Sequence, residues 1–301
     1  MNRHVSRRRF LTTAGALGAG IGLAGLKGSM SLAAEVAQAA PHADQLGWPI
    51  GCGSWTFHTY TLFEGIEKVA ALGLKLFESG PHPKLSKAEP NTAFDENSPP
   101  RVLKAVKQKL ADCGLKFLSY GDINYSKDPS RKTFDFAKEM GAEIILSEPQ
   151  AKAFDMLDKL CEEYDIKLAI HDHPKPTRYW NPDFVLKVCR DRSHRIGACC
   201  DTGHWLRSGL NPVECIKKLE GRIIYFHFKD LNKAGNHADT HDVPWGTGVC
   251  DVPGMLAEVH RQGGKAPFFV EYEYHWETSM PEIAQSIKFF DKVAAELAAK
   301  G

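Results

Sequence analysis

The hydrophobic and polar positions of this chain follow two alternating patterns. Short runs of consecutive apolar residues, typical of strands buried on both faces, alternate with longer amphipathic stretches typical of helices. The runs that predict strands are residues 50–55, 74–79, 116–121, 143–148, 167–173, 195–201, 222–229 and 267–273. The predicted helices are residues 62–72, 100–113, 130–140, 152–164, 183–190, 212–219, 253–262 and 281–298.

The order of these elements predicts one α/β domain. Glycine follows several helical patterns, as at Gly73 and Gly141, and proline begins others, as at Pro212 and Pro253. Eight strand–helix units in about 260 residues predict a (β/α)8 TIM barrel over residues 44–300. A doubly wound open sheet shares the alternation, but no G-x-G-x-x-G follows the first strand.

Residues 1–39 differ from the rest of the chain. Residues 6–11 read S-R-R-R-F-L and precede an apolar stretch rich in alanine and glycine, and residues 37–39 (A-Q-A) offer the small side chains of a cleavage site. This pattern predicts a twin-arginine signal and a periplasmic or otherwise exported protein. An uncleaved anchor is the alternative, but the stretch is too short and too glycine-rich for a span of about 20 residues. We therefore expect no stable membrane insertion after signal removal.

Composition limits the partners of the mature protein. The chain has 38 basic and 37 acidic residues, and residues 1–39 hold five of the basic and one of the acidic ones. The remainder has a net charge of −3, which lacks the basic surface that nucleic acids require. We expect a small-molecule partner and no nucleic acid, and a homo-oligomer remains open.

The eight cysteines include the adjacent pair Cys199 and Cys200 and no C-x-x-C pair, which predicts buried free thiols.

Acidic and imidazole side chains lie where several predicted strands end. Glu148, Asp201, His227 and Glu271 come from the fourth, sixth, seventh and eighth strands. Barrel enzymes hold their reacting groups at the carboxyl ends of the strands, so we expect these four side chains to converge. Charged groups that are buried away from water need a counter-ion, and a divalent cation can supply the opposite charge. This mostly oxygen set favours Mn²⁺, with Mg²⁺, Co²⁺ or Zn²⁺ as alternatives.

Further polar residues share the inward faces of these strands. Because side chains alternate along a strand, residues two apart on the fifth, seventh and eighth strands share a face. The candidates for proton transfer and hydroxyl polarisation are His171, His173, His204, Lys229 and Glu273. The spacing leaves open whether His173 is also a metal ligand. Each acid alone would also suit a buried salt bridge with Lys229 or Arg207. The long connections 80–99 and 231–252 are candidate lids over the same mouth.

Four motifs resemble those of a known superfamily: D-T-G-H-W at 201–205, H-F-K-D at 227–230, W-G-T-G-V-C-D at 245–251 and V-E-Y-E at 270–273. From Trp48 to about Ala298 the chain resembles the sugar phosphate isomerase/epimerase superfamily, which has the xylose isomerase-like barrel. The resemblance implies a divalent metal on a Glu, Asp, His, Glu set and reactions of hydroxy-ketones. It matches Asp201, His227 and Glu271 to metal ligands and His204 to a substrate-contacting histidine.

One departure from the family pattern affects the expected activity. Epimerases of the superfamily have a glutamate ligand on the fifth strand, where this chain has His171, so Glu148 is expected to replace it, as in dehydratase-like branches. The expected function is a metal-dependent isomerase or epimerase that acts on an unphosphorylated sugar or keto-sugar through an enediolate. Sugar phosphates are cytoplasmic, so the absence of phosphate is expected from the export signal.

Three other functions remain as alternatives. The first is a metal-dependent lyase or hydratase of 3-keto-glycosides or related keto-sugars. The second is a non-catalytic sugar-binding protein, although a pure binder has little need of several carboxylates and imidazoles directed at one point. The third is a metal-dependent apurinic endonuclease, which the acidic mature charge and the export signal disfavour.

Overall fold

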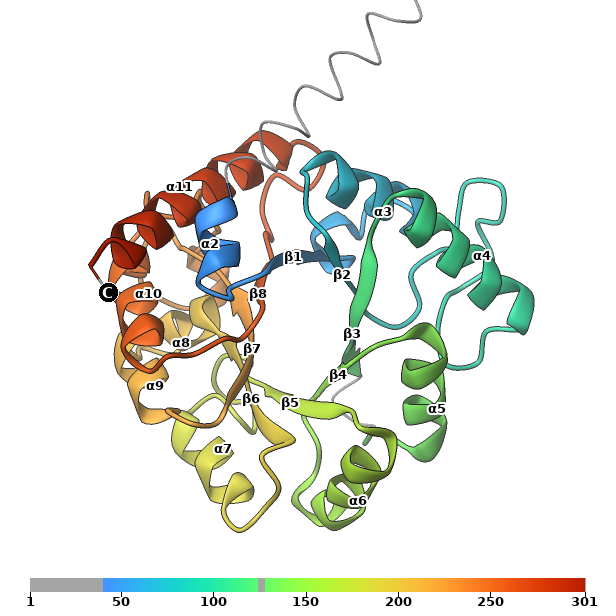
Figure 1. Cartoon of the computed structure of the whole chain (residues 1–301), viewed down its shortest axis with the longest axis horizontal. Coiled ribbons are helices and arrows are strands. Elements are labelled where there is room, and N and C mark those ends of the chain that lie inside the picture. Colours follow the sequence, from blue (N-terminus) through green and yellow to red (C-terminus); the bar gives the residue numbers. More distant parts are fainter. Residues whose placement is uncertain (1–39, 124–127, 301) are drawn as a thin grey trace, which may run out of the picture.

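A computed structural model of the chain describes residues 40–123 and 128–300, and the signal predicted for residues 1–39 lies outside them. Eight parallel strands close into a barrel in the order β1 to β8, seen along its axis in Figure 1. The strands are β1 (Ile50–Gly53), β2 (Leu76–Ser79), β3 (Lys116–Ile123), β4 (Ile144–Ser147), β5 (Lys167–His171), β6 (Ile196–Asp201), β7 (Ile223–Phe228) and β8 (Phe268–Val270). The predicted single-domain TIM barrel is therefore confirmed.

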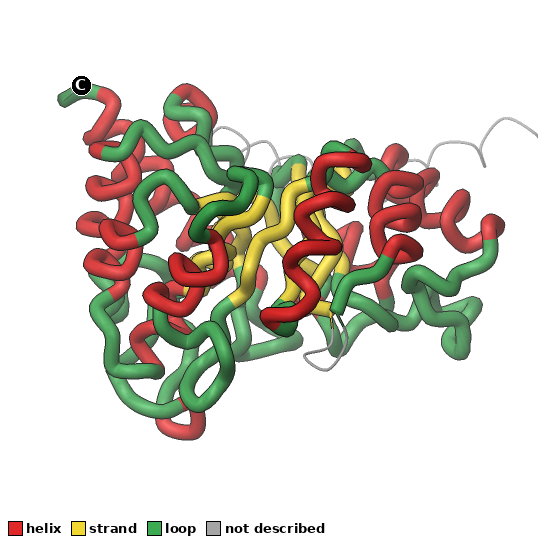
Figure 2. The backbone as a smooth tube through the Cα atoms, turned by 90° about the horizontal axis from the view of Figure 1, so that it is seen from below, coloured by secondary structure: helices red, strands yellow, loops and turns green. Residues whose placement is uncertain are grey.

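An outer layer of helices surrounds the strands, as the side view in Figure 2 also shows. The helices that follow the strands are α3 (Leu62–Ala71), α4 (Pro100–Asp112), α5 (Arg131–Met140), α6 (Phe154–Tyr164), α7 (Pro182–Cys189), α9 (Pro212–Lys218), α10 (Val252–Arg261) and α11 (Met280–Ala298). Local chemistry sets their ends. Thr61 and Glu64 form a capping box at the start of α3, and Gly141 ends α5 with φ of 82°. None of the helices described is long and apolar enough to cross a membrane.

Short elements that the sequence patterns did not predict lie mostly in the connections. They are α2 (Pro41–Gln45), α8 (Thr202–Arg207) and the 3-10 turns η1 (Trp55–Phe57), η2 (Ala151–Ala153) and η3 (His237–Asp239). Each has fewer than two full turns, so it carries too little periodicity to stand out in the sequence. All eight cysteines are free and seven are buried, which confirms the predicted thiols.

Large side chains fill the middle of the barrel. A buried cluster made only of strand residues includes the rings of Tyr225 and Phe269, which stack with centroids 4.7 Å apart. Gly51 of β1 lies against the Phe269 ring, and a Cβ atom on Gly51 would lie 2.3 Å from Phe269 Cζ. Residue 51 must therefore lack a side chain if Phe269 is to occupy the barrel axis.

An irregularity in β7 determines which of its side chains face the interior. Ala198 of β6 pairs with Ile223 and the next residue, Cys199, pairs with Tyr225, so Ile224 is an extra residue in the ladder. Such a bulge shifts the alternation of the side chains beyond it. As a result, Tyr225 and His227 point into the barrel, where both contact Glu78 of β2.

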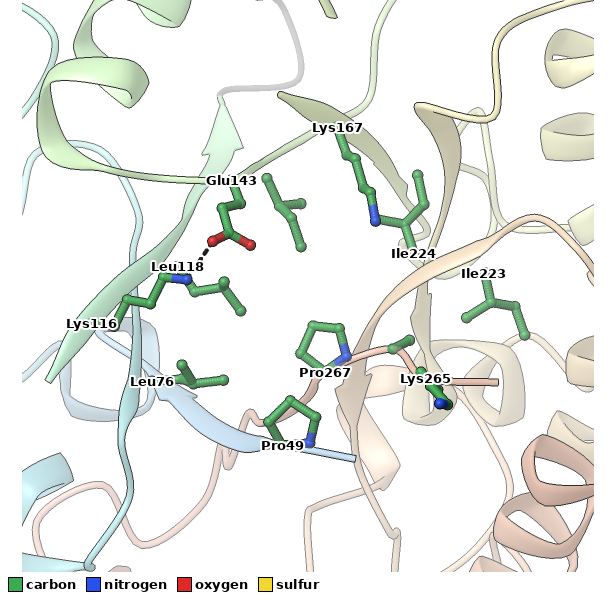
Figure 3. A pocket seen from close by; sticks show the side chains of 12 residues that line it. Pro49, Leu76, Lys116, Leu118, Glu143, Lys167, Ile223, Ile224, Lys265 and Pro267 are labelled. Atoms are coloured by element: carbon green, nitrogen blue, oxygen red, sulfur yellow. Dashed lines mark hydrogen bonds and ion pairs between the residues drawn. The ribbon is translucent and has the colours of Figure 1, made fainter. Parts of the chain in front are cut away.

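The two ends of the barrel differ in chemistry. Near the amino ends of the strands a hollow of about 430 Å³ has an apolar floor that includes Leu118 and Ile224, beside an ion pair of Lys116 and Glu143 (Figure 3). None of the described residues that line this hollow is a histidine. At the carboxyl ends a cavity of about 1010 Å³ is lined by histidines and acids. The candidate chemistry lies at this second end, where barrel enzymes hold their active sites.

The close approach of Gly51 and Phe269 makes a testable prediction. Gly51→Ala is expected to destabilise the protein by about 1–3 kcal/mol, because the added methyl group overpacks the barrel centre. The matched control is Gly65→Ala in α3, where a Cβ atom would make an ordinary 3.6 Å contact with Phe57. The control should be neutral or stabilising by up to about 1 kcal/mol. Urea unfolding midpoints measure both effects, and equal midpoints for the two variants would contradict the interpretation.

Candidate active site

The carboxyl ends of four strands bring together His171, Asp201, His227 and Glu271, which we call the ligand cluster. One nitrogen or carboxylate oxygen of each residue lies within 4.8 Å of those of the other three. His171 ends β5, Asp201 ends β6, His227 precedes the last residue of β7, and Glu271 follows β8. Because parallel strands end at the same edge of a barrel, residues distant in sequence meet here.

Glu78 holds the ring of His227 in the orientation that the ligand cluster needs. Nε2 of His227 lies 3.1 Å from Glu78 Oε1, and Nδ1 lies 2.8 Å from His171 Nε2. Tyr225 donates a second hydrogen bond, of 2.7 Å, to Glu78 Oε2. A carboxylate that accepts the outer N–H of a histidine is the common arrangement behind a metal-binding imidazole. Glu78 therefore directs Nδ1 of His227 toward the other ligands.

Glu78 is not among the site residues predicted from the sequence. Its strand was predicted, and the acid close to the end of that strand was the available signal. The role of Glu78 depends on Tyr225 and His227, which lie about 150 positions away in the chain and reach it only after the barrel closes. A carboxylate near the end of an apolar run is therefore the only sign of this role that can be read in the sequence.

Asp201 and Lys229 occupy their places for local reasons. Asp201 caps α8, because its Oδ1 atom accepts the backbone N–H of His204 at 2.8 Å. Its Oδ2 atom lies 3.0 Å from Lys229 Nζ. Gly203 leaves room for the lysine stem, since a Cβ atom there would lie 2.9 Å from Lys229 Cδ. The D-T-G-H motif thus positions Asp201 and leaves space for Lys229, the cation that pairs with it.

Lys229 is fully buried among carboxylates. Its Nζ atom lies 2.6 Å from Glu271 Oε2 and 2.7 Å from Glu273 Oε2, besides its contact with Asp201. Burial alone would lower the pKa of Lys229, but Asp201 and Glu271 outweigh burial and raise this pKa well above its ordinary value. Lys229 therefore stays protonated at neutral pH and acts as a fixed cation and hydrogen-bond donor rather than as a base.

The histidines of the site differ in charge. Burial and the neighbouring imidazole of His173 lower the pKa of His171 well below its ordinary value. Burial and Lys229 do the same for the pKa of His204. Burial opposes protonation of His227 too, but Glu271 and Glu78 outweigh it and raise the pKa of His227 to about 10. At neutral pH His171 and His204 are therefore neutral.

The ligand cluster fits a divalent metal ion. It offers two imidazole nitrogens and two carboxylate oxygens, and metal–ligand distances of about 2.0–2.3 Å would let one ion reach donors that lie this close together. Burial opposes ionisation of Asp201, but Lys229 and nearby imidazoles outweigh it and lower the pKa of this carboxyl group. Asp201 therefore offers an ionised carboxylate to a dication.

Glu148 lies outside the ligand cluster. It follows β4, and its Oε1 atom lies 2.5 Å from Nδ1 of His173. Glu148, His171 and His173 form a second group of close donors. The structure thus brings three of the four predicted ligands together, with His171 beside them. The assignment of Glu148 as a ligand stays a prediction, and its contact also suits a residue that orients His173.

Two further predicted residues, His204 and Glu273, lie beside the cluster. Arg207, in α8, donates hydrogen bonds of 3.1 Å to His204 Nδ1 and to Glu273 Oε2. Because a guanidinium group only donates, Nδ1 of His204 is the acceptor and Nε2 carries the proton. His204 can therefore donate a hydrogen bond to a substrate hydroxyl. The Glu273 carboxylate is held by Arg207 and Lys229, and both of these neighbours lower its pKa against the effect of burial.

Both long connections contribute residues to the cavity at this end. The 80–99 connection provides a wall that includes Pro81 and His82, and the 231–252 connection provides His237. The second connection is tied to the barrel by Asp230, whose carboxylate accepts the N–H groups of Gly246, Gly248 and Cys250 at 2.9–3.0 Å. The motifs H-F-K-D and W-G-T-G-V-C-D meet in this contact. The predicted lid movement of either connection remains a prediction.

The comparisons with known proteins agree with the geometry. The family model of the xylose isomerase-like TIM barrel matches residues 66–293. An uncharacterised protein of Parabacteroides distasonis is 30% identical, with 82% of this chain and 99% of that chain covered and a TM-score of 0.65. A search of functionally curated proteins gave no significant match.

Two more distant structures share the fold. L-ribulose 3-epimerase is 15% identical, with 84% of this chain and 96% of that chain covered and a TM-score of 0.63. A xylose isomerase-like protein of Mycobacterium smegmatis, solved in complex with magnesium, is 16% identical. The match covers 83% of this chain and 97% of that chain, with a TM-score of 0.62. The family model covers most of the chain, and the barrel is complete. This chain therefore belongs to the xylose isomerase-like TIM barrel family.

Proposed function

We propose that this protein is a divalent-metal-dependent isomerase or epimerase that acts on an unphosphorylated sugar or keto-sugar. The observation that carries the proposal is the ligand cluster, in which His171, Asp201, His227 and Glu271 offer converging donors. Glu271 also lines the large cavity. Family membership agrees with this class of enzyme. Mn²⁺ is the proposed metal, and the magnesium bound by a structural relative supports an ion of this kind.

The surrounding residues supply proton transfer and orientation. When bound, the metal ion would stabilise the negative charge that develops on the sugar oxygens as the α-proton leaves. His173 faces the Glu148 carboxylate through Nδ1, so Nε2 is the nitrogen that accepts the proton. Glu148 orients this base and stabilises its charged form. His204 donates through Nε2–H to a hydroxyl group, and Lys229 keeps Asp201 ionised.

The charge of the cavity supports an unphosphorylated substrate. Its lining includes Glu78, Glu271 and Glu273, which would repel a phosphate group. The described lining also includes two cationic side chains, Lys84 and Lys87, and Lys87 is paired with Glu64 at 2.6 Å. The residues typical of a twin-arginine signal support the further proposal that the protein is exported, away from the cytoplasmic pool of sugar phosphates.

A lyase or hydratase of 3-keto-glycosides is the second candidate. His171 in place of the expected fifth-strand glutamate favours it, because this substitution departs from the epimerase pattern. An isomerase and a lyase both begin with removal of the same α-proton and differ in what the resulting anion does next. A hydratase runs the elimination in reverse. The skeleton of the product separates them.

Metal binding tests the role of Glu78. Glu78→Gln is expected to weaken Mn²⁺ binding about 10- to 100-fold, because the imidazole of His227 loses the carboxylate that orients it. Titration calorimetry of metal-free protein with Mn²⁺ measures the effect. Glu143→Gln, at the opposite end of the barrel, is the matched control and should bind as the wild type does. An equal loss in both variants, or none in Glu78→Gln, would remove Glu78 from the metal site.

Hydrogen exchange tests the reaction. Mn²⁺-loaded protein incubated with keto-sugars and 3-keto-glycosides in D₂O should place deuterium on a carbon next to the carbonyl group, as mass spectrometry and NMR can detect. His173→Gln should slow this exchange about 10²- to 10⁴-fold, because the general base is lost. His194→Gln, in the exposed turn before β6, is the control. Absence of exchange with every sugar, or exchange that persists unchanged in chelator, would overturn the proposal.

A further inference from the structure

Trp55, at the start of η1, is a large aromatic side chain that stays half exposed at the mouth of the cavity. Four large hydrophobic side chains are exposed in the described part of the chain: Trp55, Met156, Phe184 and Val249. Of these, Trp55 alone lines the cavity, with 51% of its surface exposed. Its exposed apolar surface is therefore available to pack against a ligand that enters the cavity.

Three contacts fix the Trp55 ring in place. Its Nε1 atom donates a hydrogen bond of 2.9 Å to Glu273 Oε1. His58 stacks on one face, with centroids 4.6 Å apart and planes 20° from parallel. The ring of Trp276 lies edge-on to both, at 6.4 Å from Trp55 and 4.2 Å from His58. With one face covered by His58, the exposed half of the residue is the part available to a ligand, and little side-chain freedom is lost on binding.

The Trp55 ring lies next to the ligand cluster but outside it. Glu273, which accepts its N–H group, also contacts Lys229, and Lys229 contacts Glu271 of the cluster. Beyond Trp55, the cavity is lined by residues of the segments 54–65 and 80–90, including Tyr60 and Pro81. A sugar ring held at the cluster would therefore leave the part of the cavity beyond Trp55 unfilled.

The size of the cavity agrees with a longer ligand. Its volume of about 1010 Å³ is at the upper end of the range for pockets that enclose drug-sized molecules, which are much larger than one sugar ring. The C–H face of a sugar or the face of an aromatic group packs well on an indole ring. Its Nε1–H is already satisfied by Glu273, so the ring offers this packing surface without an unmet polar group.

We propose that Trp55 forms a subsite for a second ring, so that the substrate is a glycoside or disaccharide and not a free monosaccharide. Its reacting ring lies at the ligand cluster and the ring attached through the glycosidic bond stacks on Trp55. The proposal rests on the proposed function for the position of the reacting ring. It goes further by assigning the class of substrate.

Binding measurements test the subsite independently of turnover. Mg²⁺-loaded protein is titrated with cellobiose, maltose and 4-nitrophenyl β-D-glucoside, and with glucose as the one-ring reference. At least one two-ring probe should bind about tenfold more tightly than glucose. Trp55→Ala should abolish this preference, and Trp55→Phe, which keeps an aromatic face, should retain most of it. Phe184→Ala is the matched control, because Phe184 is similarly exposed on α7 but does not line the cavity.

The outcomes separate the subsite from the proposed function. If no two-ring probe binds more tightly than glucose, or if Trp55→Ala and Phe184→Ala change the preference equally, the subsite is refuted. Two-ring preference without any deuterium exchange would retain the subsite and refute the isomerase. Exchange on a monosaccharide without two-ring preference would do the reverse.

Discussion

The buried ammonium group of Lys229 is the interaction on which the arrangement of this site depends. Asp201, Glu271 and Glu273 lie together out of water, and without a cation they would repel one another and take up protons. Lys229 opposes the uptake of protons at each of them and holds them close together. Removal of one partner from such a buried set typically costs about 3–5 kcal/mol, because the remaining charges lose their compensation. The side chains of the protein itself therefore hold these carboxylates in place.

Lys229 and His227 reach the interior because of the backbone that precedes them. The bulge at Ile224 gives β7 one residue more than its partner strand, and without it the alternate side chains of β7 would face the helices. Below the site, Phe269 fills the barrel axis and packs on Tyr225, which in turn holds Glu78. The same packing that stabilises the barrel thus positions the carboxylate behind His227.

The fold could be predicted from the sequence because its signals are local. Apolar runs and helical periodicity depend on neighbouring residues, and they gave the correct order of eight strands and their helices. Asp201, His227 and Glu271 could be selected for the same reason, since each lies at or just beyond the end of such a run. The strand ends were less certain. Glu148 and Glu271, expected within strands, lie immediately after them.

The details of the site depend on contacts that no local pattern encodes. The sequence indicated His171 as a candidate for proton transfer, but its place beside His227 depends on the reach of side chains across two strands. Glu78 was missed because its partners lie on β7. The exposed face of Trp55 depends on Glu273 and His58, which hold the ring from different connections. Long-range geometry of this kind appears only when the barrel is closed.

The way in which the 231–252 connection is attached determines where this barrel can accept changes in loop length and sequence. Asp230 binds the amide groups of residues 246–250, and Gly248 must lack a side chain, since a Cβ atom there would lie 2.3 Å from Asp230 Oδ1. A bridge between Leu231 and Asp242 closes the connection above this point. Insertions, deletions or grafted loops between residues 233 and 239 would therefore alter the surroundings of His237, while the residues of the ligand cluster keep their places. New ligand specificities can arise there by exchange of a short hairpin tip.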